Sequence, residues 1–142
     1  MKKEIRHSWF YNHPPEKVWA YLTKPELIEQ WLMKTDFDPV IGKEFKFFLK
    51  PMPDFGLDGI IHCKVLELVP FKKLSYSWKS GPGEGRITTD SIVVWTLHPD
   101  NNGTELLLVH SGVDENNPLY SMMNEGWRQN IKKIETRINE TL

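Results

Sequence analysis

Apolar and polar residues alternate along the start of the chain. Between Glu4 and Tyr11, successive side chains of an extended segment would point to opposite faces. One face then carries Ile5, His7, Trp9 and Tyr11, and the other carries Arg6, Ser8 and Phe10. This pattern predicts the first strand of a sheet.

Prolines mark the next two elements. The Pro14–Pro15 pair fits the first turn of a helix, because the N–H that proline lacks would have no partner there. The residue before Pro25 is pushed out of helical geometry, which predicts the end of this helix. Thr23 and Glu26 have the spacing of a capping box, so we expect a second short helix that continues through Trp31.

Strand-like segments fill the middle of the chain from Gly42 onward. Each segment is separated from the next by residues that favour turns, mainly Pro, Gly and Asn. The segments span residues 44–50, 60–69, 73–79, 90–98 and 104–112. Their connections are too short for the crossovers that parallel neighbours need, so we expect sequential antiparallel pairing.

A helical repeat dominates the last part of the chain. Asn117 and Pro118 suit the N-cap and first position of a helix. Apolar residues then recur every three or four positions toward the chain end. They are Leu119, Met122, Met123, Trp127, Ile131, Ile134 and Ile138. This stripe and the inner face of the sheet both need cover, so we expect them to pack together.

These elements predict an α+β fold with residues 1–142 as one domain. In chain order they are a strand, two short helices, five more strands and a long helix, with no repeat or linker between them. The expected architecture is a curved six-stranded antiparallel sheet wrapped around the long C-terminal helix.

Charge and cysteine content narrow the classes of partner. The chain carries 18 Lys and Arg against 19 Asp and Glu, a formal net charge of -1, so we expect no nucleic-acid partner. No run of about 18 apolar residues is present, so we expect no membrane span. Cys63 is the only cysteine and forms no intramolecular disulfide, which fits a cytoplasmic location. Neither the charge nor the cysteine content determines the oligomeric state.

Several short segments, taken in order, make the chain similar to one family over nearly its whole length. They are Pro14-Pro15-Glu16-x-Val18-Trp19, Leu22-Thr23-x-Pro25-Glu26-x5-Trp31, Val65-Leu66-Glu67-Leu68-Val69-Pro70, Leu74-Ser75-Tyr76-Ser77-Trp78, Gly103-Thr104-Glu105-Leu106-x-Leu108-x-His110-Ser111-Gly112 and Gly126-Trp127. The chain thereby resembles the START-like superfamily, in particular the branch related to the activator of the ninety-kilodalton heat-shock protein's ATPase.

The resemblance implies a helix-grip fold with a cavity between the sheet and the C-terminal helix. Different members use this cavity for lipids, polyketide-type compounds or hormones, so the implied partner is a small hydrophobic molecule. The family's name also implies a chaperone ATPase as an alternative partner. Because the sequence opens directly on its first strand, without a preceding domain, we expect chaperone ATP hydrolysis to be unchanged by this chain.

No catalytic or metal-binding motif stands out in the sequence. The five histidines, His7, His13, His62, His98 and His110, show no paired ligand spacing, and Cys63 has no second cysteine to complete a zinc motif. His62 and Cys63 are neighbours on a strand and point to opposite faces, so they form no thiolate–imidazole pair. We therefore expect neither a metal nor a cofactor.

Inward-facing aromatic residues suggest where a ligand would bind. An apolar pocket needs large rigid side chains and a few polar groups, although the same side chains could simply fill a core. The predicted lining is Tyr76, Trp78, Trp95, Leu108, His110, Met123, Trp127 and Asn130. The loops at residues 50–56 and 79–89 are either the rim of this cavity or ordinary hairpin loops.

Two alternatives concern the polar residues of this set. His110 could be a structural histidine bonded to a backbone group or to the Ser111 turn, because an unpaired buried imidazole would cost about 1–3 kcal/mol. Alternatively, His110 or Tyr76 could act as general acid or base in a cyclase-like or hydrolase-like enzyme. No paired carboxylate or activated nucleophile is visible, so a binding protein is the favoured interpretation.

Overall fold

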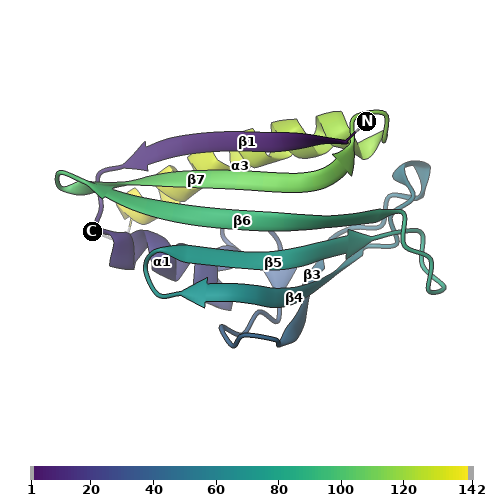
Figure 1. Ribbon diagram of the computed structural model, residues 1–142, viewed down its shortest axis with the longest axis horizontal. Helices are drawn as coiled ribbons and strands as arrows, with labels where there is room; N and C mark the ends of the chain where they lie inside the picture. Colours follow the sequence, from purple (N-terminus) through teal and green to yellow (C-terminus); the bar gives the residue numbers. More distant parts are fainter. Residues whose placement is uncertain (1, 141–142) are drawn as a thin grey trace.

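The computed structural model describes residues 2–140 and has one antiparallel sheet with helices on one side. The elements are β1 (Lys2–Tyr11), α1 (Pro15–Thr23), α2 (Pro25–Ile28), β2 (Lys34–Thr35), β3 (Glu44–Phe48), the 3-10 turn η1 (Pro53–Phe55), β4 (Ile60–Val69), β5 (Lys73–Ser80), β6 (Thr89–Asp100), β7 (Gly103–Asp114) and α3 (Leu119–Glu140). Figure 1 shows α3 running behind β1 and β7, with α1 on the same side of the sheet. The predicted α+β helix-grip architecture is confirmed.

The strands lie in the order β1-β7-β6-β5-β4-β3-β2, and every neighbouring pair is antiparallel. The sheet therefore has seven strands, and the expected number of six was wrong by one. The additional strand, β2, has only two residues, which pair with Phe47 and Phe48 of β3. Two residues are too few for an alternating pattern, so the sequence carries no signal for β2.

The two short helices meet at Pro25 as predicted, but the capping box is wrong. The Thr23 hydroxyl donates to the Trp19 carbonyl oxygen within α1 (2.9 Å), and Lys24 is the residue at the start of α2. The second helix ends at Ile28 and does not reach Trp31. A threonine hydroxyl within a helix often bonds four residues back in this way, and at Thr23, the last residue of α1, this bond removes it as a cap for the next helix.

The long helix begins as the sequence predicts. The Leu119 N–H donates to the Asn117 side-chain oxygen (2.9 Å), and the Asn117 amide donates to Thr89 on β6 (3.2 Å). The cap thus also joins the helix start to the sheet. The described helix ends at Glu140, and the last two positions of the predicted helix, 141–142, lie outside the described residues.

The inner face of β1 is attached to α3 by side chains. Tyr11 is fully buried and donates its hydroxyl to the Ile131 carbonyl oxygen (2.7 Å). The Trp9 indole N–H donates to Glu135 (3.1 Å). The predicted alternation of β1 is confirmed, and these hydrogen bonds set the position of the helix across the sheet.

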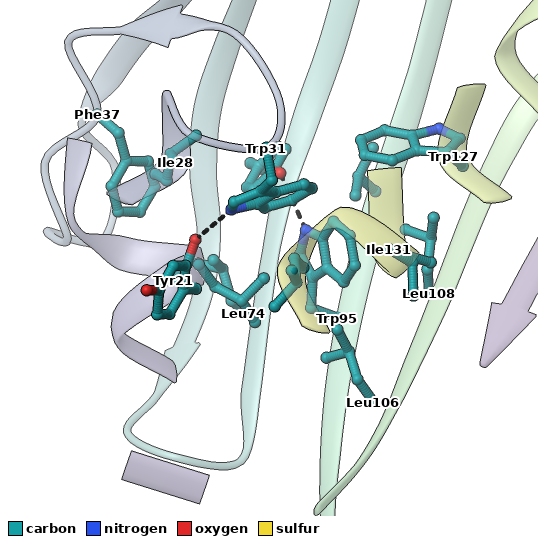
Figure 2. Packing of buried hydrophobic residues seen from close by; sticks show 14 of the residues in the cluster. Tyr21, Ile28, Trp31, Phe37, Leu74, Trp95, Leu106, Leu108, Trp127 and Ile131 are labelled. Atoms are coloured by element: carbon teal, nitrogen blue, oxygen red, sulfur yellow. Dashed lines mark hydrogen bonds between the residues drawn. The ribbon is translucent and has the colours of Figure 1, made fainter. Parts of the chain in front are cut away.

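Aromatic rings form the centre of the core. Trp95 meets Trp31 edge to face at 5.8 Å between ring centroids and meets Trp127 at 5.5 Å (Figure 2). The Trp31 indole N–H donates to the Tyr21 carbonyl oxygen (2.8 Å). These contacts join the α1–α2 segment, the sheet and α3 around one tryptophan, and they fill the space on the side of α1.

No helix within residues 2–140 is long and apolar enough to cross a membrane.

Candidate ligand-binding pocket

An apolar pocket of about 250 Å³ lies at one end of the sheet, beside the first half of α3. Its lining comes from β4, β5, α3, the segment that follows α2, and the chain that leads from β3 through η1. The lining residues are Leu32, Met33, Leu49, Met52, Leu57, Ile61, Trp78, Ser80, Leu119, Met122, Met123, Gly126, Trp127 and Asn130. The walls are thus mostly apolar, with four thioethers and two indoles.

Strand alternation explains the wall that β5 provides. Trp78 and Ser80 are both buried and point to the inner face, whereas Lys79 between them is exposed. Trp78 packs against Trp127 of α3 at 5.4 Å between ring centroids. The two indoles form the end of the pocket that faces the core, and Ser80 lies further along the strand.

Helical spacing explains the opposite wall. Met122, Met123, Gly126, Trp127 and Asn130 recur at intervals of three or four along α3 and therefore share one face. A methyl group built on Gly126 would meet no atom within 4 Å. The helix therefore leaves open space at Gly126.

His110 is the centre of a hydrogen-bonded chain beneath the pocket. The Trp127 indole N–H donates to His110 Nδ1 (2.9 Å), and His110 Nε2 lies 2.8 Å from Ser91 Oγ. An indole nitrogen only donates, so Nδ1 carries no proton and Nε2 is the protonated atom. Ser91 then donates to the Trp78 carbonyl oxygen (2.9 Å). This tautomer fixes which group donates and which accepts in each of these three hydrogen bonds.

Burial keeps this imidazole neutral. His110 has no exposed surface, and the loss of hydration lowers its pKa to about 3. The partners expected for His110, a backbone group or the Ser111 turn, were wrong. Ser91 faces inward on the adjacent strand and Trp127 faces inward from α3, so their side chains reach the ring nitrogens first.

Tyr76 is likewise enclosed in the core. Its hydroxyl accepts the Trp95 indole N–H (2.9 Å), and burial raises the pKa of the phenol well above its usual range. Cys63 is buried on the inner face of β4, where burial raises the pKa of the thiol. The exposed His62 points the other way, as strand alternation predicted.

The structure divides the eight predicted lining residues into two groups. Trp78, Met123, Trp127 and Asn130 line the pocket. Tyr76, Trp95, Leu108 and His110 lie in the buried layer next to it, where Trp95 and His110 contact Trp127. Strand alternation predicts that the five strand residues of this set face the inner side of the sheet. It carries no information on how closely α3 approaches each of them.

Sequence reasoning missed the wall formed by connecting segments. Leu32, Met33, Leu49, Met52 and Leu57 line the pocket, and none of them belongs to a long periodic element. The available signal was the presence of two apolar residues, Met52 and Leu57, within the Pro- and Gly-rich stretch that follows β3. Of the two loops considered as a rim, residues 50–56 supply Met52, whereas residues 79–89 supply only Ser80.

Within residues 2–140, no three His, Cys, Asp or Glu side chains are grouped so that they could hold a metal ion.

The curved sheet, the long helix across it and the pocket between them define a START-like protein of the helix-grip class. Residues 12–139 match the family described as Activator of Hsp90 ATPase homolog 1-like protein, and the chain belongs to this family. No curated protein matches the chain.

Solved structures support the same assignment. Protein MLL2253 from Mesorhizobium loti is 35% identical, with 99% of each chain covered and a TM-score of 0.86. CalU16 from Micromonospora echinospora is 24% identical over 96% of this chain and 76% of its own, with a TM-score of 0.77. The Aha1 dimer from Colwellia psychrerythraea is 20% identical over 96% of both chains, with a TM-score of 0.79. The last two similarities concern the fold alone.

Proposed function

We propose that this chain is a non-catalytic binding protein that holds a small hydrophobic molecule in the pocket beside α3. The observation that carries the proposal is an apolar cavity of about 250 Å³ whose walls include two indoles and four flexible methionine side chains. Ligand sites are typically concave and apolar with a few polar groups, and usually measure about 300–1,000 Å³. A cavity just below this range suits a compact ligand.

The eight predicted residues have two roles in this proposal. Trp78, Met123, Trp127 and Asn130 would contact the ligand. The remaining four, Tyr76, Trp95, Leu108 and His110, would support the contacting indoles from the layer beneath. The unpaired Cys63 thiol agrees with a reducing, cytoplasmic setting, which is part of the same proposal.

Catalysis by His110 or Tyr76 is the less favoured candidate. Both nitrogens of His110 are engaged, and its lowered pKa keeps it from accepting a proton near neutral pH. The Tyr76 hydroxyl lies in the core, with a pKa raised by burial, and is not among the groups that line the pocket. Neither group has the access that a general acid or base needs.

Gly126 provides a direct test of the pocket. Gly126→Phe should place a ring in the open space beside the helix and remove binding, because the ligand and the ring would compete for one volume. The measurement is native mass spectrometry of freshly purified protein, compared with its denatured mass. We expect a co-purified small molecule on the wild type and a bare chain for Gly126→Phe.

The matched control for this test is Gly126→Ala. It adds a methyl group that meets no atom within 4 Å and removes a helix-interior glycine, so the free energy of unfolding should rise by about 0.5–1 kcal/mol while the ligand is retained. Thermal unfolding of both variants checks that they are folded. A ligand that persists on folded Gly126→Phe would place the binding site elsewhere.

The family name supports a second candidate, interaction with a chaperone ATPase. The expectation from the sequence is that ATP hydrolysis by the purified chaperone is unchanged when this protein is added. A clear stimulation that Gly126→Phe leaves intact would instead favour a surface interaction that is independent of the pocket.

A further inference from the structure

We propose that the pocket selects an uncharged ligand whose apolar body carries a hydrogen-bond-accepting oxygen, such as a ketone, and that the Trp78 indole N–H binds this oxygen. The inference rests on the proposed binding function and adds the chemical class of the ligand. It follows from the charges and the hydrogen bonds of the lining.

The lining excludes a charged ligand. None of the residues that surround the pocket is Asp, Glu, Lys, Arg or His. A carboxylate or ammonium group would lose its hydration in this space and find no opposite charge, which is strongly unfavourable. A hydrophobic acid would therefore bind less well than a neutral compound of the same shape.

Two buried tryptophans, Trp19 and Trp78, donate the indole N–H to no acceptor within residues 2–140, and of these two only Trp78 lines the pocket. Trp31, Trp95 and Trp127 each donate the indole N–H to an acceptor at 2.8–2.9 Å. Only 5% of Trp78 is exposed, yet no acceptor among residues 2–140 hydrogen-bonds to its N–H. An indole nitrogen can only donate, so an oxygen in the pocket is the partner that this group lacks.

The free N–H of Trp78 must reach accessible space. No fully enclosed polar side-chain atom in the described part of the chain lacks a hydrogen-bond partner. The Trp78 nitrogen has no partner and is therefore not fully enclosed, and the space that Trp78 lines is the pocket. A ligand oxygen placed there would satisfy a donor whose burial without a partner costs about 1–3 kcal/mol.

Two further polar groups line the same space. Ser80, with 2% of its surface exposed, has no side-chain hydrogen bond within the described structure, and neither has Asn130 on the helix wall. A hydroxyl and an amide can each donate or accept, so they suit a second polar atom without demanding a charge. The obligate donor, Trp78, sets the requirement for an acceptor.

Three probes built on one naphthalene ring system test the proposal. 2-Acetylnaphthalene offers a carbonyl oxygen, 2-ethylnaphthalene lacks it, and 2-naphthoate replaces it with a charge. In titrations of the wild-type protein we expect the ketone to bind about tenfold more tightly than the ethyl compound, and the carboxylate to bind more weakly than the ketone by at least about the same factor. In ¹H–¹⁵N spectra, the indole signal that Trp78→Phe removes should move downfield with the ketone only.

Variants assign the preference to one atom. Trp78→Phe keeps an aromatic ring but has no N–H, so the ketone should lose its advantage over the ethyl compound. Lys133→Ala, on the exposed side of α3 and outside the pocket lining, is the control and should retain the advantage. If Trp78→Phe does not fold, the Trp78 indole signal is assigned in the wild-type protein by triple-resonance and NOE spectra, and its shift with the ketone provides the same test.

The outcomes separate this inference from the proposed function. Equal affinity of the wild type for the ketone and the ethyl compound, or an unmoved Trp78 indole signal, would overturn the acceptor requirement while leaving a hydrophobic binding protein. A carboxylate that binds as tightly as the ketone would overturn the selection for neutral ligands. Binding of none of the three probes would count against the binding function itself.

Discussion

Replacing His110 by alanine is expected to lower the free energy of unfolding by roughly 3–5 kcal/mol. The substitution removes a fully buried ring and leaves a cavity, and it takes away the acceptor of the Trp127 indole N–H. Ser91 would also lose the donor on its oxygen. Urea unfolding monitored by circular dichroism measures the loss, which should lower the melting temperature by about 10 °C or more.

A double-mutant cycle isolates the hydrogen bond in this loss. Trp127→Phe has no N–H to leave unpaired, so His110→Ala should cost less in that background, by about 1–2 kcal/mol. Lys133→Ala, on the exposed side of α3, should change stability by no more than about 0.5 kcal/mol. Purely additive effects of His110→Ala and Trp127→Phe would mean that the imidazole contributes only volume.

Acid should destabilise the protein through the same residue. The pKa of His110 is lowered to about 3 in the folded state, compared with about 6.5 in an unfolded chain. Between these values the unfolded state binds the additional proton, so stability is lost as pH falls below about 6.5. Lowering the pH from 7 to 5 should cost about 2 kcal/mol from this one group.

The variant His110→Gln separates this effect from other titrations. Glutamine cannot gain a proton, and every other ionisable group is common to both proteins. The free energy of unfolding of each is measured by urea at pH 7 and pH 5, and the wild type should lose about 2 kcal/mol more than the variant. An identical loss in both would show that the pKa of His110 does not differ between the folded and unfolded states.

This stability profile also bears on function. The protonated ring would carry a proton on Nδ1 and could no longer accept from Trp127, whose indole lines the pocket. His110 thus acts as a positioning group for a pocket wall, and the pH at which it titrates lies far below neutrality. The pocket should therefore keep its shape throughout the neutral range.

Much of the fold could be predicted from periodicity alone. The alternation between Glu4 and Tyr11 predicted β1 and its inner face, and the repeat after Asn117 predicted α3 and its buried stripe. Both signals are long, and both follow from the direct relation between side-chain spacing and backbone geometry. The two-residue strand β2 and the true end of α2 carried no comparable signal.

The division of the predicted lining depended on the tertiary structure. Trp78 and Trp95 both face inward by alternation, yet Trp95 packs between Trp31 and Trp127 while Trp78 borders open space. The α1–α2 segment fills one end of the inner face, and at the other end the wall is built from connecting chain and from a helix that carries Gly126.

The amino-acid sequence by itself thus determined which side chains face the interior, because strand and helix periods are local properties of the backbone. Only the tertiary structure decided which of those side chains are covered. Whether the Trp78 N–H finds a partner depends on how segments distant in sequence pack against it, and that packing is a property of the folded chain as a whole.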